Sequence, residues 1–119
     1  MVEKMNNKME GFYECMGKIF GSRIVQRQIN DRIYDDNDKE WYIYKEDERV
    51  VACVSVLKDV IKNVYTVKDN YLEKILKEIR KEIKIKESVV PNVYAELYEK
   101  AGFKINKTDS MKNFVIIYD

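Results

Sequence analysis

The sequence predicts an α/β (α+β) fold in which a mixed, mostly antiparallel sheet is flanked by helices. Five apolar residues recur at helical spacing in the middle of the chain, which indicates an amphipathic helix: Leu72, Ile75, Leu76, Ile79 and Ile83. Two apolar runs before this helix are separated by short charged turns, as is typical of antiparallel strands. Short apolar segments also follow the helix, and the only proline, Pro91, ends the first of them.

The first part of the chain is expected to form two helices. From Glu3 to Phe20, methionine and aromatic residues recur at helical spacing, and Gly21-Ser22 suits a helix end followed by a new N-cap. A second helix is predicted from about Arg23 to Ile33. The Asp35–Asp38 segment is interpreted as a solvated turn, because it lacks the glycine and the distal glutamate of a calcium-binding loop.

Three strands in an antiparallel meander are expected next. Apolar residues fill the segments Trp41–Tyr44, Arg49–Leu57 and Val60–Val67. The first two segments are divided by the charged turn Lys45–Glu48, and the last two by Lys58-Asp59. Such short connections join strands that lie side by side.

The rest of the chain is predicted to alternate between helices and strands. Asp69 or Asn70 is a natural N-cap for the amphipathic helix, and Asn92 for a last helix that runs through Lys100 with Gly102 at its C-terminus. A short strand is expected between these helices, at Lys84–Val90, and the closing strands are Lys104–Thr108 and Asn113–Tyr118, joined near Asp109-Ser110. The predicted order is α-α-β-β-β-α-β-α-β-β, in a single domain that spans residues 1–119.

Composition narrows the classes of function. The chain has 119 residues and a net charge of +1, so a nucleic-acid partner is not expected. It contains no histidine, which excludes Ser-His and Cys-His nucleophile pairs and His-ligated zinc, and no metal site is predicted. Cys15 and Cys53 are expected to be buried, reduced thiols of a cytoplasmic protein. The sequence has no apolar run long enough to cross a membrane.

The order of elements and two sequence segments resemble the GNAT superfamily of N-acetyltransferases. The segments are Trp41–Val67, which is similar to the hairpins of that family, and the run LYEKAGFKI at Leu97–Ile105. The resemblance implies a sheet that splays between its fourth and fifth strands and holds acetyl-CoA there. It further implies that the pantetheine arm pairs with the backbone of Val64, Tyr65, Thr66 and Val67, that Asn92 contacts the cofactor, and that Tyr98 is the general acid for the departing thiolate.

The sequence departs from the pattern of this family at the loop that normally holds the pyrophosphate. Val67–Leu72 contains no glycine and no arginine, and the loop is shorter than in the family. Asp69 and Glu73 place negative charge at the start of the following helix, where a phosphate would otherwise be favoured. The first strand usual in the family is not evident, and Asn92 lies one residue closer to Tyr98 than in many relatives.

Two functions therefore stand side by side. One is an acyl-CoA-dependent N-acyltransferase, whose acceptor and general base are left open, although Glu40, Glu46 and Asp59 are available carboxylates. The alternative is a non-catalytic GNAT-like domain that binds a protein partner or associates with itself. Tyrosines suit such an interface, and the residues considered as anchors are Tyr42, Tyr44, Tyr65 and Tyr71.

Overall fold

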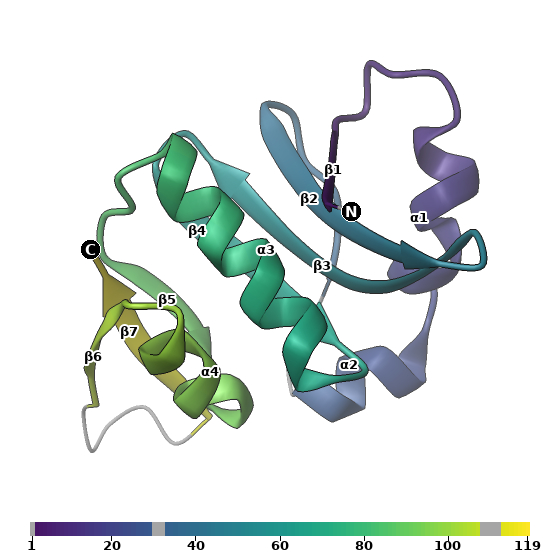
Figure 1. The fold of residues 1–119 in the computed structure, drawn as a ribbon. Helices are drawn as coiled ribbons and strands as arrows, with labels where there is room; N and C mark the ends of the chain where they lie inside the picture. Colours follow the sequence, from purple (N-terminus) through teal and green to yellow (C-terminus); the bar gives the residue numbers. More distant parts are fainter. Residues whose placement is uncertain (1, 30–32, 108–112) are drawn as a thin grey trace.

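The computed structural model describes residues 2–29, 33–107 and 113–119 as two antiparallel sheets with helices packed around them (Figure 1). The elements in chain order are β1 (Val2–Met5), α1 (Phe12–Phe20), α2 (Arg23–Ile29), β2 (Lys39–Glu46), β3 (Arg49–Leu57), β4 (Val60–Thr66), α3 (Asp69–Glu82), β5 (Ser88–Pro91), the 3₁₀ helix η1 (Asn92–Tyr94), α4 (Ala95–Lys100), β6 (Lys104–Asn106) and β7 (Phe114–Tyr118). The predicted fold class is confirmed.

The first sheet has the strand order β1-β2-β3-β4, with every pair antiparallel. Its last three strands form the predicted meander. Asp47 and Glu48 turn the chain between β2 and β3 with φ angles of 51° and 64°. Positive φ at both central residues gives a turn whose twist matches that of the flanking strands. The hairpin thus adopts this turn without a glycine.

Strand β1 corrects the prediction of a helix beginning at Glu3. Val2–Met5 pairs antiparallel with the Trp41–Tyr44 stretch of β2, so the chain begins with a strand at the edge of the sheet. The Asn6 side-chain oxygen accepts a hydrogen bond of 3.0 Å from the Lys8 N–H, and α1 starts only after Gly11, whose φ is 81°. The helical spacing misled because the strand is stabilised by a partner far away in the sequence.

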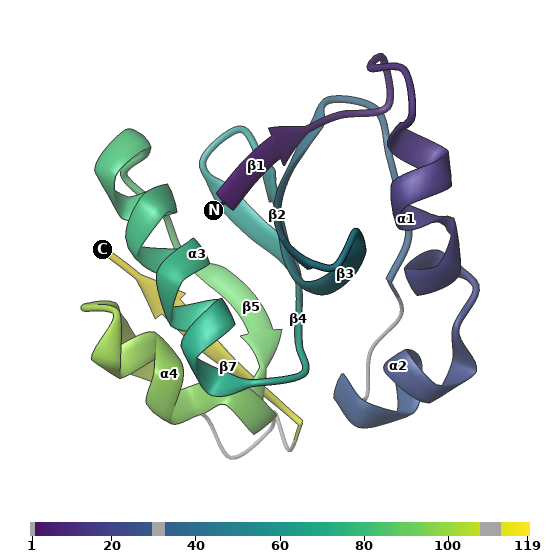
Figure 2. The same cartoon turned by 45° about the vertical axis from the view of Figure 1, so that its right-hand side comes forward.

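The second sheet has the order β5-β7-β6 and is also antiparallel. Helix α3 packs on β2, β3 and β4, whereas α1 contacts β3 and α2 contacts β4. Figure 2 shows α1 and α2 on one side of the first sheet and α3 on the other, with α4 beside α3 over the second sheet. The first sheet is therefore covered on both faces.

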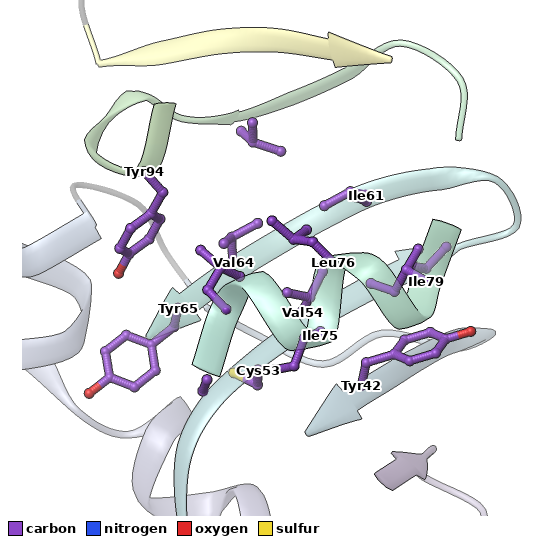
Figure 3. Close-up of a cluster of buried hydrophobic side chains, with 14 of the residues drawn as sticks. Tyr42, Cys53, Val54, Ile61, Val64, Tyr65, Ile75, Leu76, Ile79 and Tyr94 are labelled. Atoms are coloured by element: carbon purple, nitrogen blue, oxygen red, sulfur yellow. The ribbon is translucent and has the colours of Figure 1, made fainter. Parts of the chain in front are cut away.

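Much of the core lies between α3 and the first sheet, and the core continues on the other face, where Phe12, Met16 and Ile19 of α1 are buried. The predicted apolar stripe of α3 is confirmed for Leu72, Ile75, Leu76 and Ile79, which are completely buried, whereas Ile83 is half-buried at the C-cap, just beyond the helix. Figure 3 shows Ile75, Leu76 and Ile79 against residues of β3 and β4. Burying each such side chain contributes about 1.5–3 kcal/mol, so this one helix holds much of the structure together.

Two predicted helix starts are wrong. Helix α3 begins at Asp69 itself, with Lys68 at the N-cap and no side-chain cap, so neither Asp69 nor Asn70 caps it. The last helix does not run unbroken from Asn92, because η1 comes first and α4 starts at Ala95. Asn92 makes no side-chain cap; its backbone N–H instead donates to the Asn113 carbonyl at 2.8 Å.

The C-terminus of α4 matches the prediction for Gly102. The Gly102 N–H donates to the Glu99 carbonyl and the Phe103 N–H to the Tyr98 carbonyl, both at 3.0 Å. This pair of bonds is the Schellman motif, and it needs a residue with positive φ, here 102° at Gly102. The glycine of the YEKAGF run is thereby explained by helix capping alone.

Other boundaries shift in smaller ways. β5 occupies Ser88–Pro91, later than the predicted Lys84–Val90, and Pro91 is its last residue. The predicted turn at Asp109-Ser110, residue Thr108 and part of the second helix (residues 30–32) lie outside the described residues. Both cysteines are free; Cys53 is buried, which raises the pKa of its thiol, but Cys15 is only half-buried.

The interpretation of Asp35–Asp38 as a solvated turn holds for the last three residues, which are exposed, but not for the Asp35 carboxylate. This carboxylate accepts hydrogen bonds from Asn7 Nδ2 at 3.0 Å, the Tyr13 hydroxyl at 3.2 Å and Trp41 Nε1 at 3.0 Å. These donors come from the loop after β1, from α1 and from β2. Asp35 therefore joins three elements on the α1 side of the sheet.

Candidate functional site

The sheets separate between β4 and β5. In the part of the chain that the structure describes, no ladder of backbone hydrogen bonds joins these two strands. They are linked near their beginnings, where the Ile61 N–H donates to Ser88 Oγ at 2.9 Å and the Lys86 N–H to the Asp59 carbonyl at 2.8 Å. The hydroxyl of a side chain thus replaces a backbone partner, and the strands are free to diverge toward their ends. We call this region, from Ile61 and Ser88 to Thr66 and Pro91, the splay.

The edge of β4 that faces the splay ends at Thr66. The Val67 N–H donates to the Val51 carbonyl of β3 at 2.9 Å. Because hydrogen-bonding groups alternate between the two sides of a strand, the backbone N–H and C=O of Thr66 point away from β3 and into the splay. A buried strand edge of this kind must find partners for its polar groups.

Tyr94 supplies the partner of Thr66. Its hydroxyl accepts a hydrogen bond of 3.2 Å from the Thr66 N–H and lies 3.4 Å from the Thr66 carbonyl, to which it donates. The side chain reaches from η1 toward the end of β4 (Figure 3). Burial is the main reason that the pKa of this phenol is raised to about 12, so it is neutral at physiological pH.

Tyr98 occupies the opposite wall of the splay. Its side chain is completely buried, and its hydroxyl donates a hydrogen bond of 3.0 Å to the carbonyl of Pro91 at the end of β5. Tyr94 and Tyr98 lie about one helical turn apart in the same short segment. The hydroxyl of Tyr94 contacts β4, and the hydroxyl of Tyr98 contacts β5. The two hydroxyls are thus polar groups at the end of the splay where β4 and β5 finish.

The connection from β4 to α3 has two residues, Val67 and Lys68. Both of its N–H groups are used within the protein: besides the Val67–Val51 bond, the Lys68 N–H donates to Thr66 Oγ1 at 3.3 Å. The Thr66 hydroxyl in turn donates to the Lys68 carbonyl at 2.5 Å. Asp69 adds a carboxylate in the first turn of α3. The connection is therefore a closed turn that offers an anion little hydrogen-bonding capacity.

A pocket of about 310 Å³ lies beside this turn. It is lined by Asp69 from α3, by Asn92 through Leu97 from η1 and α4, and by Lys107. Asp69 and Glu96 face a single lysine in this lining, so the pocket has no excess of positive charge. It leads to the Tyr94 ring from the outside of the molecule.

Comparisons with known proteins agree with this arrangement. No protein-family model and no curated protein matches the sequence, but solved structures match the fold. Escherichia coli ElaA superposes with a TM-score of 0.67 over 98% of this chain and 97% of its own, at 11% identity. Campylobacter jejuni N-acetyltransferase PseH, in complex with acetyl coenzyme A, gives 0.54 over 100% and 98%, at 14% identity. A GNAT family acetyltransferase from Elizabethkingia anophelis, with acetyl-CoA bound, gives 0.53 over 99% and 95%, at 13% identity.

The chain has the GNAT fold. At these low identities the likeness establishes the architecture, which is the one that the resemblance predicted. The GNAT fold also accounts for β1, the strand that the sequence did not reveal. The splay between β4 and β5 is where the sequence-based resemblance placed acetyl-CoA.

Within the GNAT fold, the predicted cofactor residues are distributed unevenly. Val64, Tyr65 and Thr66 are buried in β4, whereas Val67 is 51% exposed in the turn that follows. Asn92 is exposed and lines the pocket beside α3. The fold thus brings Thr66 and Tyr98 to the two walls of one splay and leaves Val67 and Asn92 at its rim; their roles stay predictions.

Sequence reasoning missed two residues of the site. Tyr94 is bulky, whereas the resemblance to the GNAT superfamily implies a small residue at this position, and that mismatch was the available signal. Ser88, which joins β5 to β4 through Ile61, had no signal, because a lone serine at the start of a strand is common. Both act through contacts between elements that a local pattern does not show.

The tyrosines considered as interface anchors pack inside the protein. Tyr42 and Tyr65 are buried, and the Tyr42 hydroxyl donates to Glu82 at 2.6 Å. Tyr44 and Tyr71 stack with their ring centroids 4.8 Å apart, and the Tyr71 hydroxyl donates to Glu46. Tyr42, Tyr44 and Tyr71 therefore have contacts within the protein, and Tyr65 is buried; a role at an interface stays a prediction.

The described residues contain no cluster of His, Cys, Asp and Glu side chains that could hold a metal ion. In the same part of the chain, no helix is long and apolar enough to span a bilayer. All three carboxylates considered as a general base are already engaged. Glu40 accepts from Asn6 Nδ2 at 3.3 Å, Glu46 accepts from the Tyr71 hydroxyl, and Asp59 pairs with Lys86 at 3.2 Å.

Proposed function

We propose that this protein is an acetyltransferase-like protein of the GNAT type, an N-acyltransferase that takes an acyl thioester in the splay between β4 and β5. The observation that carries the proposal is the strand edge at Thr66, whose backbone N–H and C=O point into the splay. An extended ligand with amide groups, such as the pantetheine arm of acetyl-CoA, adds to such an edge as another strand would. PseH and the Elizabethkingia protein bind acetyl-CoA on the same architecture.

The residues that line the splay suit the thioester end of the donor. When bound, acyl-CoA supplies the acyl group and a thiolate leaving group. Val64 and Tyr65 give β4 an apolar interior, and Thr66 offers one donor and one acceptor to an amide. Tyr98 holds a phenolic proton at Pro91 on the other wall, from which we propose that it acts as the general acid.

The residues suit the diphosphate of CoA poorly. The N–H groups of Val67 and Lys68 are already bonded, and Asp69 repels an anion at the helix start. We therefore propose that the acyl-pantetheine end dominates donor binding and that the nucleotide adds little. Donor affinity is accordingly expected to be low and nearly independent of salt.

Titration of the protein with acetyl-CoA and with S-acetyl-pantetheine, which lacks the nucleotide, tests this proposal. The two dissociation constants should differ by less than about tenfold, which corresponds to about one hydrogen bond. A grip on the diphosphate through two or three charge-assisted bonds of about 1.5–3 kcal/mol each would separate them by more than about 100-fold. Failure of both ligands to bind at millimolar concentration would overturn the assignment as an acyltransferase.

A second candidate is a non-catalytic GNAT-fold domain that binds a protein partner or a second copy of itself, in the cytoplasm. The closed turn at Val67-Lys68 and the engaged hydroxyl of Tyr98 favour it, because both leave less room for a donor. Sedimentation analysis distinguishes this candidate. A strict monomer that also captures no partner, together with saturable binding of S-acetyl-pantetheine, would rule it out.

A further inference from the structure

We propose that Tyr94 is the gate of the donor cleft, and that an acyl donor must displace its hydroxyl from Thr66 in order to bind. This inference rests on the proposed function and adds to it the residue that controls entry. The strand edge that would receive the donor already has an occupant that belongs to the protein itself.

The contact mimics the ligand that the edge would accept. One hydroxyl uses both backbone groups of Thr66, since it accepts from the N–H at 3.2 Å and donates to the carbonyl at 3.4 Å. A secondary amide of a pantetheine arm presents the same pair, one donor and one acceptor. The phenol and the amide therefore compete for the same two groups, and both cannot be bound at once.

The position of Tyr94 allows it to move without disturbing a sheet. It ends η1, a three-residue 3₁₀ helix that is not part of a strand ladder. The Tyr94 side chain itself is only 9% exposed, but its neighbour Val93 is 62% exposed, so one side of this segment faces solvent. The pocket of about 310 Å³ lined by Asp69, Asn92 and Glu96 adjoins the ring and can receive it. Rotation of one side chain would then join the pocket to the splay.

Together with the closed turn at Val67-Lys68, the gate determines which donors can bind. A donor held strongly by its diphosphate could displace the phenol at small relative cost. Here the turn provides no such hold, so the hydroxyl competes with the acyl-pantetheine end alone. Tyr94 consequently selects for donors that pair well with Thr66 through their amides, and thioesters without such amides should bind weakly.

Two measurements on Tyr94→Phe test the gate. The first needs no ligand: the Thr66 amide should exchange with solvent faster than in the wild-type protein, because its acceptor is lost. The second is the affinity for S-acetyl-pantetheine, which should rise about 3- to 10-fold, the equivalent of one net hydrogen bond. Tyr13→Phe is the matched control, because its hydroxyl bonds to Asp35 on the other side of the sheet, and it should change neither quantity.

Tyr94→Ala provides a second variant in which the ring itself is absent, and it should bind the donor at least as well as Tyr94→Phe. Unchanged exchange of the Thr66 amide would overturn the gate at its first step. Faster exchange with no gain in affinity, in a protein that does bind the donor, would overturn the gate while leaving the proposed function intact. Absence of donor binding in the wild type and in both Tyr94 variants would refute the proposed function, and the gate with it.

Discussion

Replacing Gly102 with alanine tests how the C-terminus of α4 is locked to α3. A Cβ atom at this position would lie 2.2 Å from Nη1 and 3.0 Å from Cζ of Arg80. That guanidinium donates from Nη1 to the Ala101 carbonyl at 3.0 Å and from Nε to Asp119 Oδ1 at 2.7 Å. The substitution therefore strains the backbone and displaces a side chain that joins three segments.

The expected loss is the sum of these effects. Placing an L residue at a φ of 102° costs about 1–2 kcal/mol. Losing the hydrogen bond to Ala101 costs about 1 kcal/mol. The ion pair with Asp119 adds only about 0.5 kcal/mol, because the Arg80 side chain is 39% exposed and its charge is screened by solvent. Gly102→Ala should therefore destabilise the fold by about 2–4 kcal/mol.

Urea denaturation measures this loss, which should lower the midpoint by about 1 M or more. Gly17→Ala is the control, because a Cβ there meets nothing within 4 Å and alanine in a helix is more stable by up to about 1 kcal/mol. Adding Arg80→Ala to Gly102→Ala should remove the steric part, so that the double variant loses less than the sum of the single variants. Strict additivity, or a Gly102→Ala variant as stable as the wild type, would refute the reasoning.

Three further outcomes follow from the splay. Ser88→Ala should cost about 1–3 kcal/mol and accelerate exchange of the Ile61 amide, since that buried N–H loses its acceptor; unaltered exchange there would contradict the link between β4 and β5. Tyr98→Phe should cost a similar amount, about 1–3 kcal/mol in urea denaturation, because the Pro91 carbonyl loses its donor, and a neutral result would show that water replaces the hydroxyl. Burial raises the pKa of Tyr94 from 10.0 to about 12, so between these pH values the folded state keeps a proton that the unfolded chain loses. The contribution of Tyr94 to stability is therefore full below about pH 10. It falls as the pH rises toward 12, by up to about 1.4 kcal/mol per pH unit. Tyr94→Phe should flatten the decline in unfolding free energy measured between about pH 9 and pH 11, and an unchanged slope would refute this assignment.

The features that the sequence predicted well are those decided by neighbouring residues. The stripe of α3 repeats every three or four residues, so periodicity alone identifies its buried face. The two hairpins of the first sheet follow from charged turns between apolar runs. Gly102 is recognisable because a helix end needs a positive φ that glycine adopts freely.

The features that were missed depend on partners distant in the sequence. β1 forms because it pairs with the edge of β2, and the four residues Val2–Met5 are too few for their pattern to predict a strand. Asp35 accepts hydrogen bonds from the loop after β1, from α1 and from β2. Most of these donors are distant in the sequence, so the residues next to Asp35 suggested only a solvent-exposed acid. In the sequence, Tyr94 has the features of a core aromatic residue. Only the fold shows that Thr66 lies within hydrogen-bonding distance of its hydroxyl.

The divided sheet also sets how the molecule can move. Each half keeps its own ladders, β1 to β4 in one and β5 to β7 in the other, and the described strands share none between them. The halves are tied by the contacts of α3 with α4 and of β4 with β5, by the backbone hydrogen bond from Lys86 to Asp59, and by side-chain links at Ser88 and Tyr94. Hinging about the end of the splay where Ile61 meets Ser88 would break none of these strand pairs, whereas it would have to break the contact between Tyr94 and Thr66 at the far end. The line where we place the donor is therefore one that no strand ladder of the described residues crosses.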